Sequence, residues 1–156
     1  MTITTERTSW AVKVYGDPAP KGSLKCVGGK GGRHQLVEDT ERTKPWRALV
    51  KKAGQALNLP GPLAGPVGVE ATFTVLLPGS VKPEARVWPW KRSSGIGGDV
   101  DKLGRVVLDA LEDAGVVGND AQVCDLHAVK AYPHTPVPDV LERPGLLLRI
   151  WLLGES

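Results

Sequence analysis

The most informative stretch of the chain, residues 98–115, reads GDVDKLGRVVLDALEDAG. Within it, apolar side chains recur at the spacing of one helix face, at Leu103, Val106, Val107, Ala110, Leu111 and Ala114. Gly115 follows as the residue type that most commonly ends a helix. The stretch therefore predicts an amphipathic helix over residues 100–114, with two aspartates, Asp99 and Asp101, at its start.

A second helix is predicted upstream, from Thr43 to about Leu57. Thr43 is a candidate N-cap, Pro45 suits the first turn, and apolar residues then follow at helical spacing. The other face of this helix carries Arg47 and Lys51, which are either solvated or in contact with a charged partner.

Extended segments surround both helices. Residues 10–15 alternate apolar and polar side chains, and residues 67–77 are rich in β-branched residues. The glycine-rich residues 28–32 are typical of a flexible hairpin tip or loop. Further strands are predicted over residues 34–37, 122–132 and 146–153. This order predicts a flexible segment over residues 1–9, followed by one α+β domain over residues 10–156 in which a mixed or mostly antiparallel sheet packs with two helices.

The composition of the 156 residues is ordinary for a globular protein, with 41% hydrophobic and 24% charged side chains. The longest apolar run, residues 146–153, contains Arg149 and is shorter than the ~20 residues of a membrane-spanning helix. Residues 1–9 lack the apolar core of a signal peptide. The lack of such segments leads us to expect a cytoplasmic protein. Cys26 and Cys124 have no zinc-site spacing and are expected to be reduced, mostly structural thiols.

The charges are unevenly distributed along the chain. Residues 13–52 are strongly basic, whereas residues 99–125 are rich in acidic side chains. The net charge of +3 and the pI near 9.0 are compatible with nucleic-acid binding. A basic surface beside an acidic site is the arrangement that a metal-dependent nuclease needs.

Three aspartates flank the predicted helix of residues 100–114. Asp99 and Asp101 are two residues apart at its start, and side chains at that spacing in an extended segment point the same way. Asp120 follows the helix, which spans roughly 22 Å at 1.5 Å per residue, so the next strand or the packing must carry it back to the pair. Three converging carboxylates would form a hard oxygen site suited to Mg²⁺, an ion that polarises a phosphate and activates a water.

Lys102 and Arg105 lie within about one turn of Asp101, where a cation would offset carboxylate repulsion or stabilise charge in a transition state. The aspartates and Arg105 also have a purely structural interpretation. Aspartate at a helix start is a common cap, Asp120 is a common turn residue, and Arg105 and Asp109 are spaced to pair along the helix. Both interpretations stay open at the level of the residues.

Residues 78–98 form a long basic segment that contains Trp88 and Trp90. Loops of this length in a compact domain usually serve a function or are mobile. Tryptophan interleaved with basic residues suits stacking of bases and contact with phosphates. The alternative is that the two tryptophans only pin the loop to the body of the domain.

The ordered set of motifs resembles the RusA family of Holliday junction resolvases. The family's acidic D-x-D motif, apolar helix and following turn correspond here to Asp99-Val-Asp101-Lys-Leu103, Leu108-Asp-Ala-Leu111 and Gly118-Asn-Asp-Ala-Gln-Val123, with Lys130 further along the strand. The segment Pro18-Ala-Pro-Lys-Gly22 also matches the family's P-x-P-K segment. The resemblance covers most of the chain.

The resemblance implies a RusA-like α+β fold, an intertwined homodimer and a Mg²⁺-dependent endodeoxyribonuclease, with Mn²⁺ as an alternative ion. Such an enzyme resolves four-way DNA junctions by paired symmetric nicks, and the implied setting is a bacterial or phage-infected cell. The resemblance gives metal-binding and catalytic roles to Asp99, Asp101 and Asp120. Phosphate contacts with branched DNA are expected at Lys21, Lys25, Arg47, Lys51, Arg92 and Lys130.

The family's catalytic lysine falls on Arg105 in this chain. Arginine stays charged and does not give up its proton, so Arg105 would act electrostatically, with Lys102 sharing the task. This departure keeps open a non-catalytic dimer that binds branched DNA. A different Mg²⁺-dependent structure-specific nuclease or phosphohydrolase is the other alternative, although a nucleoside triphosphatase is disfavoured because the chain has no G-x-x-x-x-G-K-[ST] loop.

Overall fold

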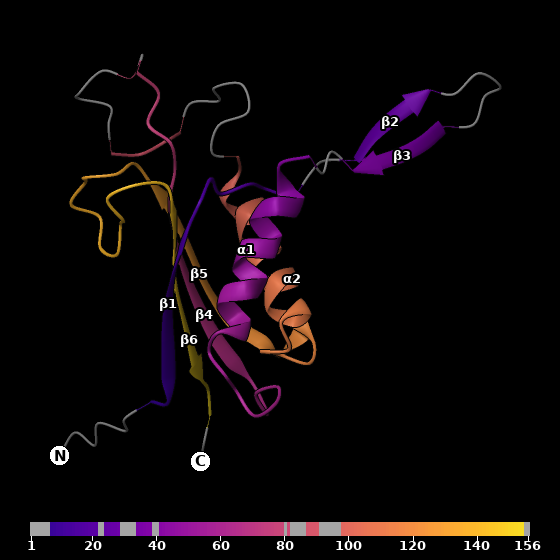
Figure 1. Ribbon diagram of the computed structural model, residues 1–156, viewed down its shortest axis with the longest axis vertical. Helices are drawn as coiled ribbons and strands as arrows, with labels where there is room; N and C mark the ends of the chain where they lie inside the picture. The colour runs from indigo at the N-terminus through magenta and orange to yellow at the C-terminus, as the bar shows by residue number, and fades with distance from the viewer. Residues whose placement is uncertain are drawn as a thin grey trace.

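The computed structural model describes residues 7–21, 24–28, 34–38, 41–79, 81, 87–90 and 98–154. Its centre is a four-stranded sheet in the order β1-β6-β4-β5 (Figure 1). The four strands are β1 (Ser9–Tyr15), β4 (Val67–Thr74), β5 (Val123–Ala131) and β6 (Gly145–Leu152). Strand β6 pairs antiparallel with β1 and with β4, whereas β4 and β5 are parallel. The expected mixed sheet is therefore confirmed.

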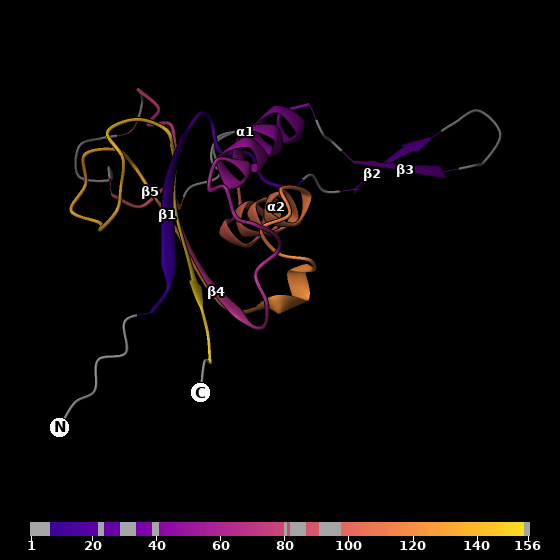
Figure 2. The ribbon, with the colours of Figure 1, turned by 60° about the horizontal axis from the view of Figure 1, so that its bottom comes forward.

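Two helices, α1 (Thr43–Gln55) and α2 (Val100–Asp113), lie side by side on one face of this sheet (Figure 2). The chain passes through α2 between β4 and β5, because two parallel strands need a crossover and cannot be joined by a tight hairpin. Helix α2 therefore runs back against the direction of the two strands that it connects. This connection sets where the two ends of α2 lie relative to the sheet.

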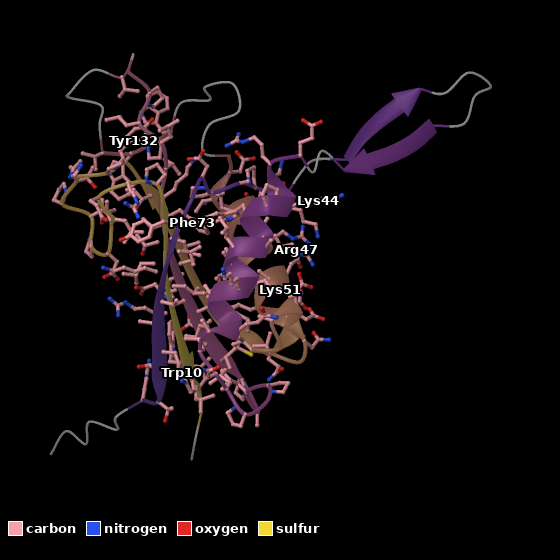
Figure 3. The ribbon with its side chains drawn as sticks, in the orientation of Figure 1. Trp10, Lys44, Arg47, Lys51, Phe73 and Tyr132 are labelled. Atoms are coloured by element: carbon pink, nitrogen blue, oxygen red, sulfur yellow. The ribbon has the colours of Figure 1, made fainter. Side chains whose placement is uncertain are left out.

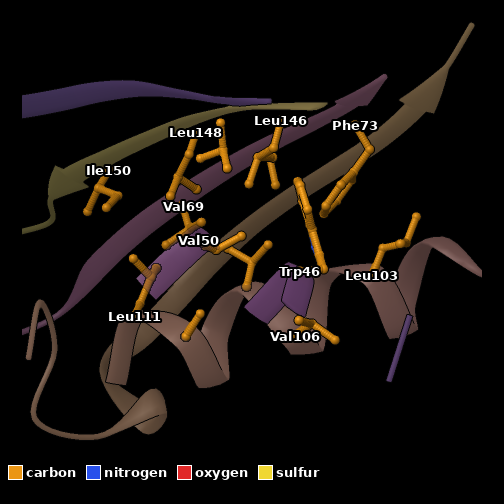
Figure 4. Packing of buried hydrophobic residues seen from close by; sticks show 14 of the residues in the cluster. Trp46, Val50, Val69, Phe73, Leu103, Val106, Leu111, Leu146, Leu148 and Ile150 are labelled. Carbon is orange, nitrogen blue, oxygen red and sulfur yellow. The ribbon is translucent and has the colours of Figure 1, made fainter. Parts of the chain in front are cut away.

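The core fills the space between the sheet and the two helices (Figure 4). Trp46 and Val50 of α1 are buried there, as are the residues of the apolar stripe predicted for α2, from Leu103 to Leu111. The sheet contributes Val69, Phe73, Leu146, Leu148 and Ile150 from strands β4 and β6. Full burial of each large apolar side chain contributes about 1.5–3 kcal/mol, so this layer is the main source of stability.

Strands β2 (Leu24–Gly28) and β3 (His34–Glu38) form a separate antiparallel hairpin. It stands apart from the sheet and the helices in both views of the ribbon (Figures 1 and 2). The strand predicted over residues 34–37 is confirmed, and Gly28 pairs with His34 at the base of the expected hairpin tip. The rest of that tip lies outside the described residues.

The expected N-cap of α1 needs correction, and the strand predicted from residue 10 begins one residue earlier. Thr43 is not the N-cap of α1: Arg42 takes that position without a side-chain capping bond, and the Thr43 hydroxyl instead donates to the carbonyl oxygen of Pro20 at 2.7 Å. Ordered pairing also begins before residue 10, because Leu152 donates its backbone N–H to the Thr8 carbonyl at 3.1 Å. Within the described ranges, no helix is long and apolar enough to cross a membrane.

We predict that Gly145→Ala destabilises the fold by about 1–3 kcal/mol, the usual cost of overpacking. A Cβ atom at Gly145 would overlap the Val14 carbonyl oxygen and lie 3.0 Å from a Leu141 methyl group, so β1 and β6 would have to separate. Urea unfolding measures the change. Gly61→Ala is the matched control, because nothing lies within 4 Å of a Cβ atom there. Equal stability of the two variants would contradict the prediction.

Candidate active site

The amino end of α2 carries the first of the predicted site carboxylates. Asp99 occupies the N-cap position with extended backbone angles, φ −74° and ψ 138°, yet its side chain makes no capping hydrogen bond. The carboxylate is 58% exposed, and its Oδ2 lies 3.6 Å from the Lys102 ammonium nitrogen. The capping interpretation of Asp99 is therefore wrong for its side chain, which remains turned to solvent.

Three contacts hold this end of α2 in place. Gly98 has φ +65°, and a Cβ atom there would lie 2.5 Å from the Pro20 ring, so the position requires glycine. Lys21 donates its backbone N–H to the Lys102 carbonyl at 3.2 Å. Lys130 of β5 donates from its ammonium to the Gly98 carbonyl at 2.8 Å. Residues 18–21, called here the proline-rich segment, and β5 thus brace the backbone immediately before Asp99.

Asp101 lies in the first turn of α2 and is exposed. The alternation expected of an extended segment does not apply to it, because the chain is already helical at Val100. Arg105 follows one turn later and is also exposed, whereas Gly104 between them faces β5. The i,i+4 spacing places Asp101 and Arg105 on the same side of the helix.

Asp120 lies at the opposite end of α2. It opens a short 3₁₀ turn, Asp120–Gln122, in which the Asn119 side chain accepts a hydrogen bond from the Ala121 N–H at 2.8 Å. Gln122 donates to the carbonyl oxygens of Leu63 and Gly65 at 2.8 and 2.9 Å, which ties this turn to the chain just before β4. The residue is thus part of a well-bonded turn far from the amino end of the helix.

The separation of Asp120 from Asp99 and Asp101 follows from the length of α2. Helix α2 has 14 residues, which corresponds to about 21 Å at 1.5 Å per residue, and Asp120 lies beyond its carboxyl end. Strand β5 then leads away from Asp120 toward Lys130, the residue that contacts Gly98. One chain therefore brings Asp99 and Asp101 together at one end but does not bring Asp120 to them. Across the described part of the chain, no group of three or more possible metal ligands forms.

Two of the cations expected to contact DNA are engaged with carboxylates of α2. The Lys21 ammonium lies 3.3 Å from Asp109 Oδ2, and Arg47 lies 3.8 Å from the same atom. Arg47 also donates from Nε to Asp113 Oδ2 at 2.6 Å, and this bond lowers the pKa of Asp113 below its ordinary value of 3.8. Asp109 thus pairs with Lys21 and Arg47, where the helix spacing had suggested Arg105. These pairs join α1 and the proline-rich segment to α2.

Four further residues were expected to contact DNA, and the structure describes the side chains of two of them, Lys51 and Lys130. Lys51 is exposed, and Figure 3 shows it with Lys44 and Arg47 along the side of α1 that faces away from the sheet. Lys130 is half-buried at the Gly98 carbonyl. The side chain of Lys25 and the whole of Arg92 lie outside the described residues.

The long basic segment is attached to the domain beside its tryptophans. Val87 accepts a hydrogen bond from the Tyr132 N–H at 3.1 Å, and Pro89 is buried, so the backbone and the proline contribute to the attachment. Trp88 and Trp90 are 53% and 74% exposed. The sequence reveals the two tryptophans, but only the structure gives their exposed fractions.

A comparison with protein families supplies the class of this protein. The model of the family described as endodeoxyribonuclease RusA matches residues 16–140, which include the proline-rich segment, both helices and all three aspartates. The chain is therefore an endodeoxyribonuclease by class. It belongs to the RusA family, whose members are Holliday junction resolvases that act on branched DNA with a divalent metal ion. A search of curated proteins finds no match.

The Arg47–Asp113 pair predicts a pH-dependent contribution to stability. The folded-state pKa of Asp113 is lowered, so the pair stabilises the protein above the ordinary value of 3.8 and this stabilisation is lost as the pH falls through the lowered pKa. Because both side chains are partly exposed, Asp113→Asn should cost only about 0.2–1 kcal/mol at about pH 7.

Urea unfolding over a pH series checks this expectation. The difference between the wild-type protein and Asp113→Asn should shrink as the pH falls below 3.8 and vanish once the pH is below the lowered pKa of Asp113. Glu112→Gln removes an exposed carboxylate from the same turn and serves as the control. A loss in Asp113→Asn that does not depend on pH would show that the ion pair is not its cause.

Proposed function

We propose that the protein resolves four-way DNA junctions by paired symmetric nicks, through Mg²⁺-assisted hydrolysis of phosphodiester bonds. The observation that carries the proposal is the amino end of α2, where Asp99 holds an exposed carboxylate that makes no capping bond, with Asp101 in the next turn and Lys102 beside it. A family match over residues 16–140 supports the activity class.

Asp99 and Asp101 are suited to hold the ion. Both carboxylates are exposed hard oxygen ligands on a braced helix end, and Mg²⁺ commonly binds one or two carboxylates together with waters and substrate phosphates. When bound, the ion would polarise the scissile phosphate and lower the pKa of an attacking water. Mn²⁺ suits the same ligands and is the alternative ion.

Lys102 and Arg105 have electrostatic roles in this proposal. The Lys102 ammonium, 3.6 Å from Asp99, offsets the repulsion between the carboxylates and orients one of them. Arg105 is exposed on the side of α2 that carries Asp101, where its guanidinium can bind a phosphate oxygen and stabilise charge that develops there. Neither role requires the side chain to exchange a proton.

The proposed homodimer supplies the third carboxylate. Asp120 lies about one helix length from Asp99 in the same chain, so a site with three carboxylates needs Asp120 from a second copy. Two equivalent sites of this kind, related by a two-fold axis, would match the two-fold symmetry of a four-way junction. The proposal thus links the intertwined dimer to the pairing of the nicks.

Co-expression of two inactive variants tests this arrangement. Asp101→Asn and Asp120→Asn homodimers should each lose Mg²⁺-dependent cleavage of a labelled four-way junction. Their heterodimer, isolated through two different affinity tags, combines intact Asp99 and Asp101 from one chain with intact Asp120 from the other. It should regain one site and produce single nicks, where the wild-type protein produces pairs.

Each alternative predicts a different result. An inactive heterodimer would contradict a site shared between chains, and wild-type cleavage by both homodimers would remove these aspartates from the catalytic machinery. A wild-type protein that binds the junction without cutting it would favour the non-catalytic DNA-binding dimer, the second candidate function, which the arginine at position 105 keeps open. Equal cutting of junction and linear duplex would indicate a nuclease without junction preference.

The helical face is the proposed surface for DNA. Lys51 is exposed on α1, whereas Lys13 is exposed on the opposite face of the sheet, on β1. We predict that Lys51→Gln weakens junction binding and lowers the slope of log affinity against log salt by about 1, as expected for one lost phosphate contact. Lys13→Gln should leave both quantities unchanged in the same titration. The reverse result would place DNA on the other face.

A further inference from the structure

We infer that Gln122 is a positioning residue for Asp120, because its side-chain amide holds the turn on which that carboxylate is presented. The turn begins at Asn119 and continues through the 3₁₀ segment Asp120–Gln122 into β5. Asp120 is exposed, whereas Gln122 is half-buried. This inference rests on the proposed function, in which Asp120 completes the metal site of a second chain.

The Gln122 amide uses its full hydrogen-bonding capacity. Its Oε1 atom accepts from the backbone N–H groups of Gly118 and Asn119, at 2.8 and 3.3 Å. Its Nε2 atom donates to the carbonyl oxygens of Leu63 and Gly65, at 2.8 and 2.9 Å. A glutamine amide has two donor hydrogens and two acceptor lone pairs, so all of them are used. The partners also fix the orientation of the amide, because both N–H groups meet one atom and both carbonyls meet the other.

These bonds tie the turn to the start of β4. The bonds accepted by Gln122 come from the turn, and the bonds that it donates go to the chain just before β4. A backbone bond supports the same junction, because Leu63 donates its N–H to the Val116 carbonyl at 2.9 Å. Val116 follows α2 and is buried in the core. The turn is therefore fixed both to the end of α2 and to the sheet.

The bonds within the turn leave the Asp120 carboxylate outside the network. Gln122 and Asn119 form a reciprocal capping box, in which the Asn119 side chain accepts from the Ala121 N–H at 2.8 Å. Among the described residues, no hydrogen bond or ion pair holds the Asp120 carboxylate. Capping alone accounts for the bonds to Gly118, Asn119 and Ala121. The two additional bonds to the chain before β4 set where the turn lies, and with it the exposed carboxylate.

Fixed placement matters for a ligand that must meet an ion held by another chain. Functional side chains have to be held within about 0.5 Å of their working positions by the residues around them. Mg²⁺ demands near-octahedral geometry at about 2.0–2.1 Å, so a displaced carboxylate binds it poorly. Asp99 and Asp101 of the same chain lie one helix length away and cannot correct the position of Asp120. Loss of the Gln122 bonds should therefore weaken the site that this chain completes.

The proposed heterodimer allows the same substitution to be tested in either chain. Its single intact site takes Asp120 only from the Asp101→Asn chain. Gln122→Met, which removes all the amide bonds, should lower single-nick cleavage at limiting Mg²⁺ about 10- to 100-fold when placed in that chain, the usual effect of losing a residue that orients a metal ligand. Placed in the Asp120→Asn chain, it should leave cleavage unchanged, because the turn of that chain presents no carboxylate to the intact site.

Binding of Mn²⁺ to the two DNA-free heterodimers, followed by the EPR signal of the free ion, gives a readout without cleavage. The affinity should fall by a similar factor in the first heterodimer and stay unchanged in the second. Thermal unfolding measures the structural cost, which both heterodimers share because each contains one Gln122→Met chain. Gln122→Glu keeps the acceptor atom and loses the two donated bonds. It is the second variant, expected to change both quantities in the same direction, and it replaces Gln122→Met if that chain does not fold.

The outcomes distinguish this inference from the proposed function. If the parent heterodimer produces single nicks and the substitution has the same effect in either chain, including no effect, the inference is overturned while the shared site stands. A loss only when the Asp120→Asn chain carries the substitution would also overturn it. If the parent heterodimer is inactive, the shared site fails and this inference fails with it.

Discussion

The parallel pairing of β4 with β5 is the constraint on which the rest of the structure depends. Two parallel neighbours must be joined by a crossover, and here the crossover contains α2, whose apolar stripe covers the sheet. The helix consequently starts at the end of the sheet where β5 finishes and ends where β5 begins. Asp99 and Asp120 flank the same helix and are separated by its length, which makes a second copy of the chain necessary for a three-carboxylate site.

The candidate site lies at the amino end of α2, which three contacts hold in place. Pro20 closes against Gly98, Lys21 bonds to the backbone of α2, and Lys130 holds the Gly98 carbonyl from the neighbouring strand. Such bracing keeps exposed carboxylates in one place at low cost, because the backbone is ordered by packing before any ion or DNA binds. The segment that carries Trp88 and Trp90 attaches at the end of the same strand, where the Tyr132 N–H donates to the Val87 carbonyl.

The charged side chains of the described residues fall into two groups in the folded protein. Part of it is used internally, since Asp109 and Asp113 of α2 pair with Lys21 and Arg47 and join the proline-rich segment and α1 to α2. Among the described residues, other charged side chains are exposed, with Lys51 on the helical face and Asp99 and Asp101 at the helix start. A basic stretch in a sequence therefore overstates the number of cations that are available to phosphates.

The main helices and strands and the family resemblance could be predicted from the amino-acid sequence alone. Apolar spacing located α2 and its buried face, alternation located β1, and the ordered motifs around Asp99 and Asp120 indicated the RusA family, because such patterns depend on residues close in the chain. The three-dimensional arrangement was needed to show that Asp120 lies at the other end of α2 from Asp99, that Lys21 is already paired, and how exposed Trp88 and Trp90 are. These properties depend on contacts between residues distant in sequence, and the parallel crossover that creates those contacts leaves no local signature.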